Sequence, residues 1–217
     1  MNVKRSLALV AVQILVVFVL TQMVLAPRLV PDPEDLYAPS AVLFGLLAFC
    51  AVMGGAGLVW WASVERPGRT WRELGWHGDR LGRQLGLGVL GALACLGIAA
   101  GLLTAVGVSL SELVEQVTSF SWPQRLVFVC IGLQAAFIEE SLFRGNLMPA
   151  LRRHMGPAAA LVLTAVLFAL YHLNPSPLAL LGKTGFGLVY GALALTQRSL
   201  VASAVAHGLC WAAVGSL

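Results

Sequence analysis

Two adjacent carboxylates inside an apolar stretch are the residues best suited to chemistry in this chain. Glu139 and Glu140 lie in a hydrophobic run, and Arg144 follows Glu140 by four residues. A charge at mid-bilayer costs about 2.5–3.5 kcal/mol on insertion scales, so an ionisable residue there predicts a functional site. The spacing of four places Glu140 and Arg144 on one helical face. Glu139 then points about 100° away around the helix and stays available as a general base.

Two histidines follow in the same half of the chain. His172 ends a Phe168-x-x-x-His172 pattern, and His207 lies in the last apolar segment. Gly156 precedes a proline, which predicts a turn between two antiparallel helices. Glu140 and His172 each lie sixteen residues from Gly156, so the hairpin would hold both at one depth, about 24 Å from the turn. His207 is expected to reach the same layer from its own helix.

Each of these residues alone also has a purely structural explanation. Glu140 and Arg144 can form a buried ion pair that fixes helix packing, and a single histidine in an apolar helix is usually a hydrogen-bonded packing residue. Two glutamates and two histidines in a common layer favour a catalytic site instead. His77 and His154 lie beside arginines and are interpreted as surface residues. Lys183 is expected to extend to the outer interface, with binding of a substrate carboxylate as the alternative.

The composition places these residues in a polytopic membrane protein. The 217 residues are 59% hydrophobic and 11% charged, whereas a soluble domain carries about 25% charged residues. The length suits one compact helical bundle, and the net charge of +4 indicates no nucleic-acid partner. The cysteines lie in apolar runs without CxxC spacing and are interpreted as buried small residues: Cys50, Cys95, Cys130 and Cys210.

The hydropathy pattern predicts an all-α transmembrane bundle of about seven spanning helices plus an interfacial segment. About twenty apolar residues cross about 30 Å of hydrocarbon as a helix. The first run is long for a signal peptide and is interpreted as a retained helix. We expect one integral membrane domain over 1–217, with a catalytic core in 121–217 that follows the helices of 1–120. The predicted spans are 6–26, 39–62, 84–106, 123–152, 157–173, 177–196 and 199–217.

The distribution of basic residues predicts the orientation. With a cytoplasmic N-terminus, inner segments hold ten basic residues and outer segments hold two, as the positive-inside rule requires. We therefore expect a multi-pass protein of the inner (cell) membrane whose C-terminus lies outside. The inner segment 63–83 combines arginines with Trp71 and Trp76, which suits a headgroup anchor; substrate gating is the alternative. Several glycines in the spans are assigned to close helix packing: Gly54, Gly55, Gly86, Gly88 and Gly91.

These motifs resemble the CAAX prenyl protease and bacteriocin-processing (CPBP or Abi) family of intramembrane endopeptidases. The similarity covers about residues 121–217 and rests on the EExxxR pattern, the FxxxH pattern and the later helical histidine. It implies a protease that acts on a membrane-anchored protein or peptide. At one position this chain departs from the family, because Trp211 stands where the family has asparagine or aspartate four residues after the histidine. Packing at an interface is the favoured role for Trp211. The site residues that the resemblance implies are Glu139, Glu140, Arg144, His172 and His207.

The resemblance also implies a mechanism. Glu139, assisted by His172, would activate a water molecule, and His207 would donate to the oxyanion. No cofactor is expected; the alternative is a zinc ion held by Glu139, His172 and His207. A bacteriocin-immunity or scaffold protein without turnover is a second alternative, and a proton-relaying transporter is disfavoured because the chain has no repeated halves. The sequence leaves open the oligomeric state and the substrate, whether prenylated protein, bacteriocin-type peptide or C-terminal sorting tail.

Overall fold

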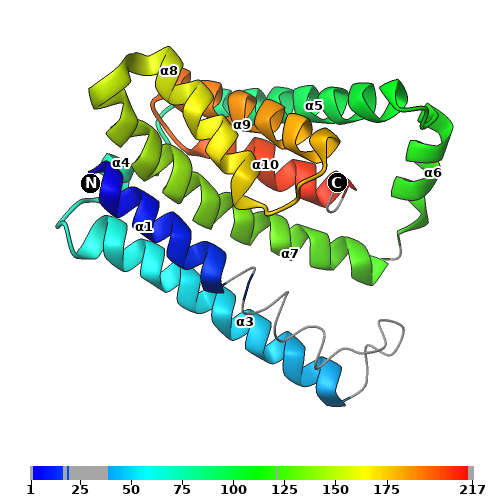
Figure 1. The fold of residues 1–217 in the computed structure, drawn as a ribbon, viewed down its shortest axis with the longest axis horizontal. Coiled ribbons are helices and arrows are strands. Elements are labelled where there is room, and N and C mark those ends of the chain that lie inside the picture. Colours follow the sequence, from blue (N-terminus) through cyan, green and yellow to red (C-terminus); the bar gives the residue numbers. More distant parts are fainter. Residues whose placement is uncertain (1, 17–18, 20–38, 121, 215–217) are drawn as a thin grey trace.

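The described part of the protein is built from helices. The computed structural model describes residues 2–16, 19, 39–120 and 122–214, and these ranges contain no strand (Figure 1). The prediction of an all-α bundle is confirmed. Two short helices, α4 (Trp71–Leu74) and α6 (Leu110–Ser119), lie between longer ones, and π-helices η2 (Trp61–Glu65) and η3 (Glu140–Leu147) continue α3 and α7. The longer helices are α1 (Val3–Gln13), α3 (Pro39–Trp60), α5 (Leu81–Ala105), α7 (Trp122–Glu139), α8 (Met148–Tyr171), α9 (Pro177–Gln197) and α10 (Val201–Val214).

Three described stretches are long and apolar enough to cross a membrane: Leu81–Ala105, Phe128–Tyr171 and Pro177–Gln197. The second has 44 residues, far more than the roughly 20 that one crossing needs. Gly156 breaks it with φ 77° and ψ 171°, a conformation that glycine adopts readily, and the chain reverses there (Figure 1). The predicted turn before Pro157 is therefore confirmed. Parts of the first and last predicted spans lie outside the described residues.

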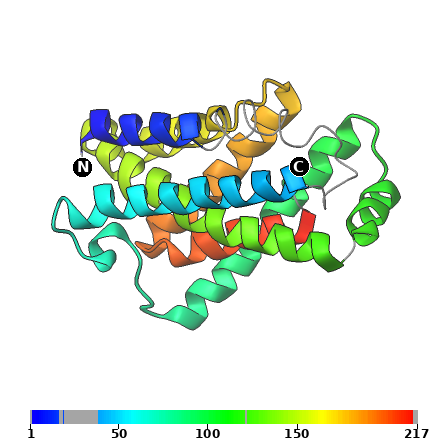
Figure 2. The ribbon, with the colours of Figure 1, turned by 90° about the horizontal axis from the view of Figure 1, so that it is seen from below.

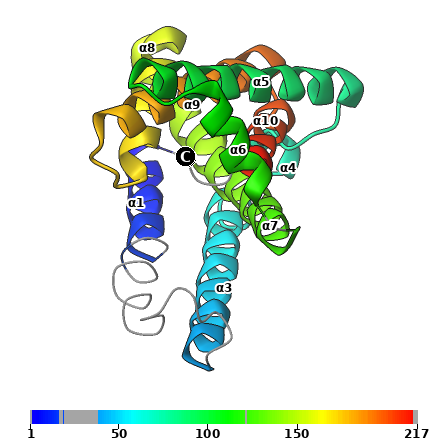
Figure 3. The ribbon, with the colours of Figure 1, turned by 90° about the vertical axis from the view of Figure 1, so that its right-hand side faces the viewer.

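The helices pack in layers around α7 and η3, which carry Glu139, Glu140 and Arg144. α10 packs against both α5 and α7, and α9 packs against α5 and α8. α1 and α3 lie on the opposite side of α7 and η3 (Figures 2 and 3). The crossing of α7 and α10 is tight, because a Cβ atom on Gly132 would lie 2.8 Å from the carbonyl oxygen of Gly208. Such small-residue crossings let helix backbones approach closely in lipid.

The glycines predicted to serve packing divide into two groups. A Cβ atom on Gly55, Gly88 or Gly91 would lie 2.6–2.7 Å from a side chain of another helix, so the prediction is confirmed there. It is wrong for Gly54 and Gly86, since no described atom outside their own stretch of helix lies within 4 Å of the Cβ position.

The cysteine and histidine interpretations also need correction. All four cysteines are free, but only Cys95 and Cys210 are buried, whereas Cys50 and Cys130 are exposed on outward helix faces. His154 is exposed as predicted. His77 is half-buried instead, because its Nε2 lies 2.9 Å from the carbonyl oxygen of Arg198 and joins the α4 segment to the end of α9.

The arginine-rich segments gather at one end of the bundle. The start of α1, helix α4, the reversal in α8 and the end of α9 lie together there, and α6 lies at the other end (Figure 1). Direct contacts join these segments, since Arg69 Nη1 donates to Asn146 Oδ1 at 3.2 Å and Leu200 N donates to Gly75 O at 2.8 Å. The segments predicted to face one side of the membrane thus share one end of the fold.

Candidate active site

Glu139 and Glu140 lie at the junction of α7 and η3, inside the bundle. Glu140 is fully buried, and Arg144 is 2% exposed. Arg144 Nη1 donates to Glu140 Oε1 at 3.0 Å, and its Nη2 donates to the carbonyl oxygen of Gly187 in α9 at 3.1 Å. The predicted ion pair between Glu140 and Arg144 is confirmed. Pairing offsets the large cost of removing both charges from water.

Glu139 has a different environment although it is the next residue. Its Oε2 lies 3.8 Å from His172 Nε2 and 3.8 Å from His207 Nε2. No described residue offers that buried oxygen a hydrogen bond. Both distances exceed direct hydrogen-bond range, and a bridging water suits such a separation. The structure therefore brings both glutamates, Arg144 and both histidines together, and one carboxylate oxygen faces two imidazole nitrogens.

The far nitrogens of both imidazoles are held by acceptors. His172 Nδ1 lies 2.8 Å from the carbonyl oxygen of Phe168, and His207 Nδ1 lies 3.0 Å from Glu140 Oε1. A carbonyl and an ionised carboxylate only accept hydrogen bonds, so each Nδ1 carries the hydrogen. In a neutral ring the Nε2 that faces Glu139 then has a lone pair.

Aromatic rings hold these groups in place. The Phe168 ring meets His172 edge-to-face with centroids 4.8 Å apart, and Arg144 Cζ lies 4.5 Å from the Phe168 centroid. Tyr190 stacks on His207 at 4.7 Å with an interplanar angle of 16°. Edge-to-face pairs and a guanidinium over a ring face are favourable arrangements. The phenylalanine of the FxxxH pattern thus supports both Arg144 and a histidine.

Several residues around η3 were not predicted from the sequence. Asn146 is buried, and its Nδ2 donates to Ser63 Oγ at 2.7 Å and to the carbonyl oxygen of Ser141 at 2.8 Å. Trp76 Nε1 donates to Ser141 Oγ at 2.9 Å. Asn146 could have been identified from the sequence, because it is an amide side chain in an apolar segment two residues after Arg144. Nothing in the sequence marks Tyr190 in a similar way.

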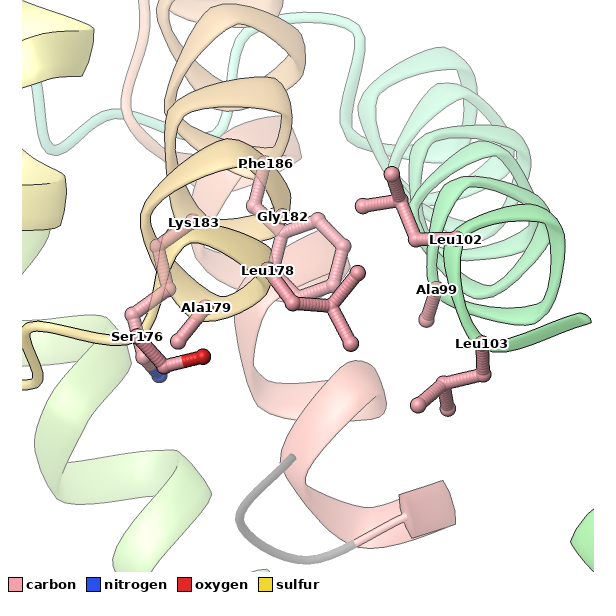
Figure 4. Close-up of a pocket in the computed structure, with 9 residues that line it drawn as sticks. All are labelled: Ala99, Leu102, Leu103, Ser176, Leu178, Ala179, Gly182, Lys183 and Phe186. Carbon is pink, nitrogen blue, oxygen red and sulfur yellow. The ribbon is translucent and has the colours of Figure 1, made fainter. Parts of the chain in front are cut away.

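A cavity of about 140 Å³ lies between α5 and α9 (Figure 4). Its wall is mostly apolar, with Leu102 and Leu103 from α5 and Phe186 from α9. Lys183 is half-buried on this wall and is the one cation among the described lining residues. Lys183 precedes Tyr190 by seven residues on α9, and Tyr190 stacks on His207. The cavity therefore combines apolar surface with a positive charge close to the site.

Trp211 lies one helical turn after His207, where α10 crosses α7. A Cβ atom on Gly132 would lie 2.8 Å from Trp211 Cβ. Trp211 therefore takes part in this helix crossing.

The three residues considered as zinc ligands, Glu139, His172 and His207, lie farther apart than the ligands of a zinc site. Two ligand atoms of one tetrahedral zinc ion lie about 3.4 Å apart, given bonds of about 2.0–2.2 Å. The oxygen of Glu139 lies 3.8 Å from each imidazole Nε2. Among the described residues, no three His, Cys, Asp or Glu side chains are placed to hold a metal ion. As placed, Glu139, His172 and His207 are too far apart to bind one tetrahedral zinc ion.

Residues 121–213 match a family model described as "Type II CAAX prenyl endopeptidase Rce1-like". No curated protein and no solved structure matches the chain significantly. The matched segment contains both motifs and His207. The family predicted from the motifs is confirmed.

Proposed function

Because residues 121–213 match the family model of type II CAAX prenyl endopeptidases, we propose that this protein is an intramembrane endopeptidase whose substrate is a membrane-anchored protein or peptide. The Oε2 atom of Glu139 carries the proposal, since it is buried and unpaired among the described residues and faces two imidazole nitrogens. Buried polar atoms are nearly always hydrogen-bonded, so an unpaired one needs an explanation. A substrate water molecule between Glu139 and the imidazoles provides it.

The proposed reaction starts from a water that donates one hydrogen to Glu139 Oε2 and the other to His172 Nε2. Glu139 takes a proton as the water oxygen attacks the scissile carbonyl carbon, and the carbonyl oxygen becomes an oxyanion. The same proton then passes to the leaving nitrogen as the carbonyl re-forms and the C–N bond breaks, which yields an amine and a carboxylic acid that keeps the second hydrogen of the water. General base catalysis of this kind contributes about 10²–10⁴-fold.

His207 is proposed to stabilise the oxyanion. Its Nδ1–H is held by Glu140, so only the imidazolium form has an Nε2–H to donate. Glu140 Oε1 lies 3.0 Å from both His207 Nδ1 and Arg144 Nη1, so its carboxylate compensates the charge of that form. The EExxxR pattern thus supplies a base and a separate carboxylate that orients an oxyanion donor.

We propose that the cavity between α5 and α9 holds an apolar substrate residue whose carboxylate meets Lys183. Lys183, Phe186 and Tyr190 share one face of α9, and Tyr190 stacks on His207. Seven residues of helix correspond to about 10 Å, and an extended peptide covers about 3.3 Å per residue. A free carboxylate at Lys183 would therefore lie about three residues beyond the bond at Glu139.

The membrane arrangement is part of the proposal. About seven helices cross the inner membrane, the N-terminus is cytoplasmic, and 121–217 is the catalytic core that 1–120 supports. The gathering of arginine-rich segments at one end of the bundle supports this orientation.

The test replaces Glu139 by glutamine, with the exposed Glu115→Gln as control. Termini of membrane proteins are compared between cells that carry each variant and wild-type cells. We expect the Glu139→Gln protein to insert normally and to lose cleavage by at least about 10²-fold, whereas the control cleaves normally. Full cleavage by Glu139→Gln would refute the proposal, and an unchanged phenotype without any cleavage in wild-type cells would favour the immunity or scaffold alternative.

Chelation followed by zinc addition tests metal dependence, and activity that only zinc restores would replace the metal-free mechanism.

A further inference from the structure

A second cavity, of about 230 Å³, lies at the arginine-rich end of the bundle. Its walls come from the α4 segment, η3, the start of α8, the end of α9 and the turn between α9 and α10. Among the described lining residues, one is acidic, Glu73, and five are arginines: Arg69, Arg72, Arg144, Arg152 and Arg198.

The positive charge in this cavity is only partly balanced. Arg144 is paired with Glu140, and Arg72 with Asp79 through two bonds of 2.6 and 2.8 Å. Arg152 and Arg198 are exposed, and neither forms an ion pair with any described residue. Two guanidinium groups are thus left for an anion.

We propose that this cavity binds the phosphate headgroup of an anionic phospholipid. A guanidinium fork matches phosphate oxygens with two parallel hydrogen bonds, and basic pockets between spanning helices bind anionic headgroups. The cavity is smaller than the roughly 300–1,000 Å³ of a pocket for a drug-sized ligand, so it admits a headgroup and leaves the acyl chains outside. The phosphate is assigned to a lipid and not to a soluble anion, because Trp71, 40% exposed on α4, places this end of the bundle in the headgroup layer.

A bound headgroup would also act on the helix that carries Glu140. The α4 segment holds that helix directly, because Trp76 Nε1 donates to Ser141 Oγ at 2.9 Å. A Cβ atom on Gly145 would lie 2.8 Å from Leu74 Cδ1, so α4 also packs tightly beside Arg144. Arginines on separate segments repel one another around this contact, and an anion between them would join α4, α8 and the end of α9.

The test measures thermal unfolding of the full chain in neutral detergent. The probes are dioctanoyl phosphatidylglycerol, dioctanoyl phosphatidylcholine and inorganic phosphate. At about a hundredfold excess over the dissociation constant, we expect phosphatidylglycerol to raise the melting temperature by about 5–10 °C and the other two probes to leave it unchanged. The double variant Arg152→Gln/Arg198→Gln should lose this shift, whereas the control Arg80→Gln/Arg83→Gln, with the same loss of charge at exposed positions outside the cavity, should keep it.

Three results would overturn the proposal. An equal loss of the shift in both double variants would mean general attraction to a basic surface. An equal shift with phosphatidylcholine would remove the need for an anion, and an equal shift with inorganic phosphate would replace the lipid by a soluble anion. Native mass spectrometry provides a second measurement, since retained phosphatidylglycerol should fall only in Arg152→Gln/Arg198→Gln. Glu139→Gln should keep the full shift, so lipid binding is tested separately from proteolysis.

Discussion

Replacing Arg144 by methionine should be among the most destabilising changes in this chain. The Arg144 side chain has no exposed surface, and it pairs with Glu140 at 3.0 Å. It also donates to the carbonyl oxygen of Gly187 and lies over the Phe168 ring. Methionine keeps much of the apolar volume but leaves the Glu140 carboxylate buried with His207 as its remaining hydrogen-bond partner.

The expected magnitude follows from the burial of both charges. Breaking a buried pair by removing one partner costs about 3–5 kcal/mol, whereas replacing both partners by neutral groups is often nearly neutral. Arg144→Met should therefore cost at least about 3 kcal/mol of unfolding free energy, and Glu140→Gln/Arg144→Met should recover about 2 kcal/mol of it. Glu140→Gln alone also leaves a buried charge without its partner, so the coupling energy should exceed about 2 kcal/mol, at or above the upper part of the range measured for residues in one network.

The assay is unfolding in mixed micelles with increasing dodecyl sulfate, followed by tryptophan fluorescence, on wild type, both single variants and the double variant. Arg72 and Asp79 provide a matched cycle, because they form a two-bond pair with 66% and 53% exposed side chains. An exposed pair should couple far more weakly than the buried pair, because water screens both charges. A double variant as unstable as Arg144→Met, or equal coupling in both cycles, would refute the argument. The stabilised double variant should still fail to cleave, because His207 has lost its carboxylate.

Three further substitutions test other parts of the structure. Lys183→Met should raise KM for a peptide substrate with a free C-terminal carboxylate and leave KM unchanged for the same peptide with a C-terminal amide. Equal changes in KM for both peptides would exclude carboxylate binding by Lys183. Hydrogen bonds from Thr70 hold the pKa of Glu73 below its usual range, so this group stabilises the fold above its unfolded pKa, and the contribution is lost as pH falls through the lower folded value. Amide protection factors in the α4 segment, which correct for the pH dependence of intrinsic exchange, should therefore fall in acid, and Thr70→Val should reduce that response. Trp211→Phe should keep cleavage if the residue only packs against Gly132, whereas a loss at unchanged stability would indicate that the indole N–H takes part.

Helix positions and the pairing of Glu140 with Arg144 could be predicted because they depend on local spacing. Apolar run lengths place the helices, and the glycine–proline pair at Gly156 places the reversal. Equal separation of Glu140 and His172 from that turn is enough to set their common depth. These features follow from helical rise and periodicity alone.

Other features depend on contacts that spacing does not encode. The π-helix η3 is accompanied by a bond from Asn146 to Ser63, which is 83 residues away. The stacking of Tyr190 on His207 likewise joins two helices. By contrast, the start of α6 carries a readable local signal, because Ser109 and Glu112 form a capping box there, although the predicted spans leave residues 107–122 unassigned.

The two glutamates differ because of what neighbouring helices bring to each. Around Glu140, η3 supplies Arg144 and α10 supplies His207, so its charge is compensated at 3.0 Å on two sides. Around Glu139, the end of α8 and α10 supply imidazole Nε2 atoms at 3.8 Å, and no described residue offers its Oε2 a hydrogen bond. Helical periodicity predicts that adjacent side chains diverge, but it does not decide which one is left uncompensated. That choice depends on His207, which orients toward Glu140 through Nδ1 and thereby turns Nε2 toward Glu139. The reactive carboxylate is therefore defined by its neighbour's pairing, and loss of Glu140 should impair catalysis even though Glu139 is intact.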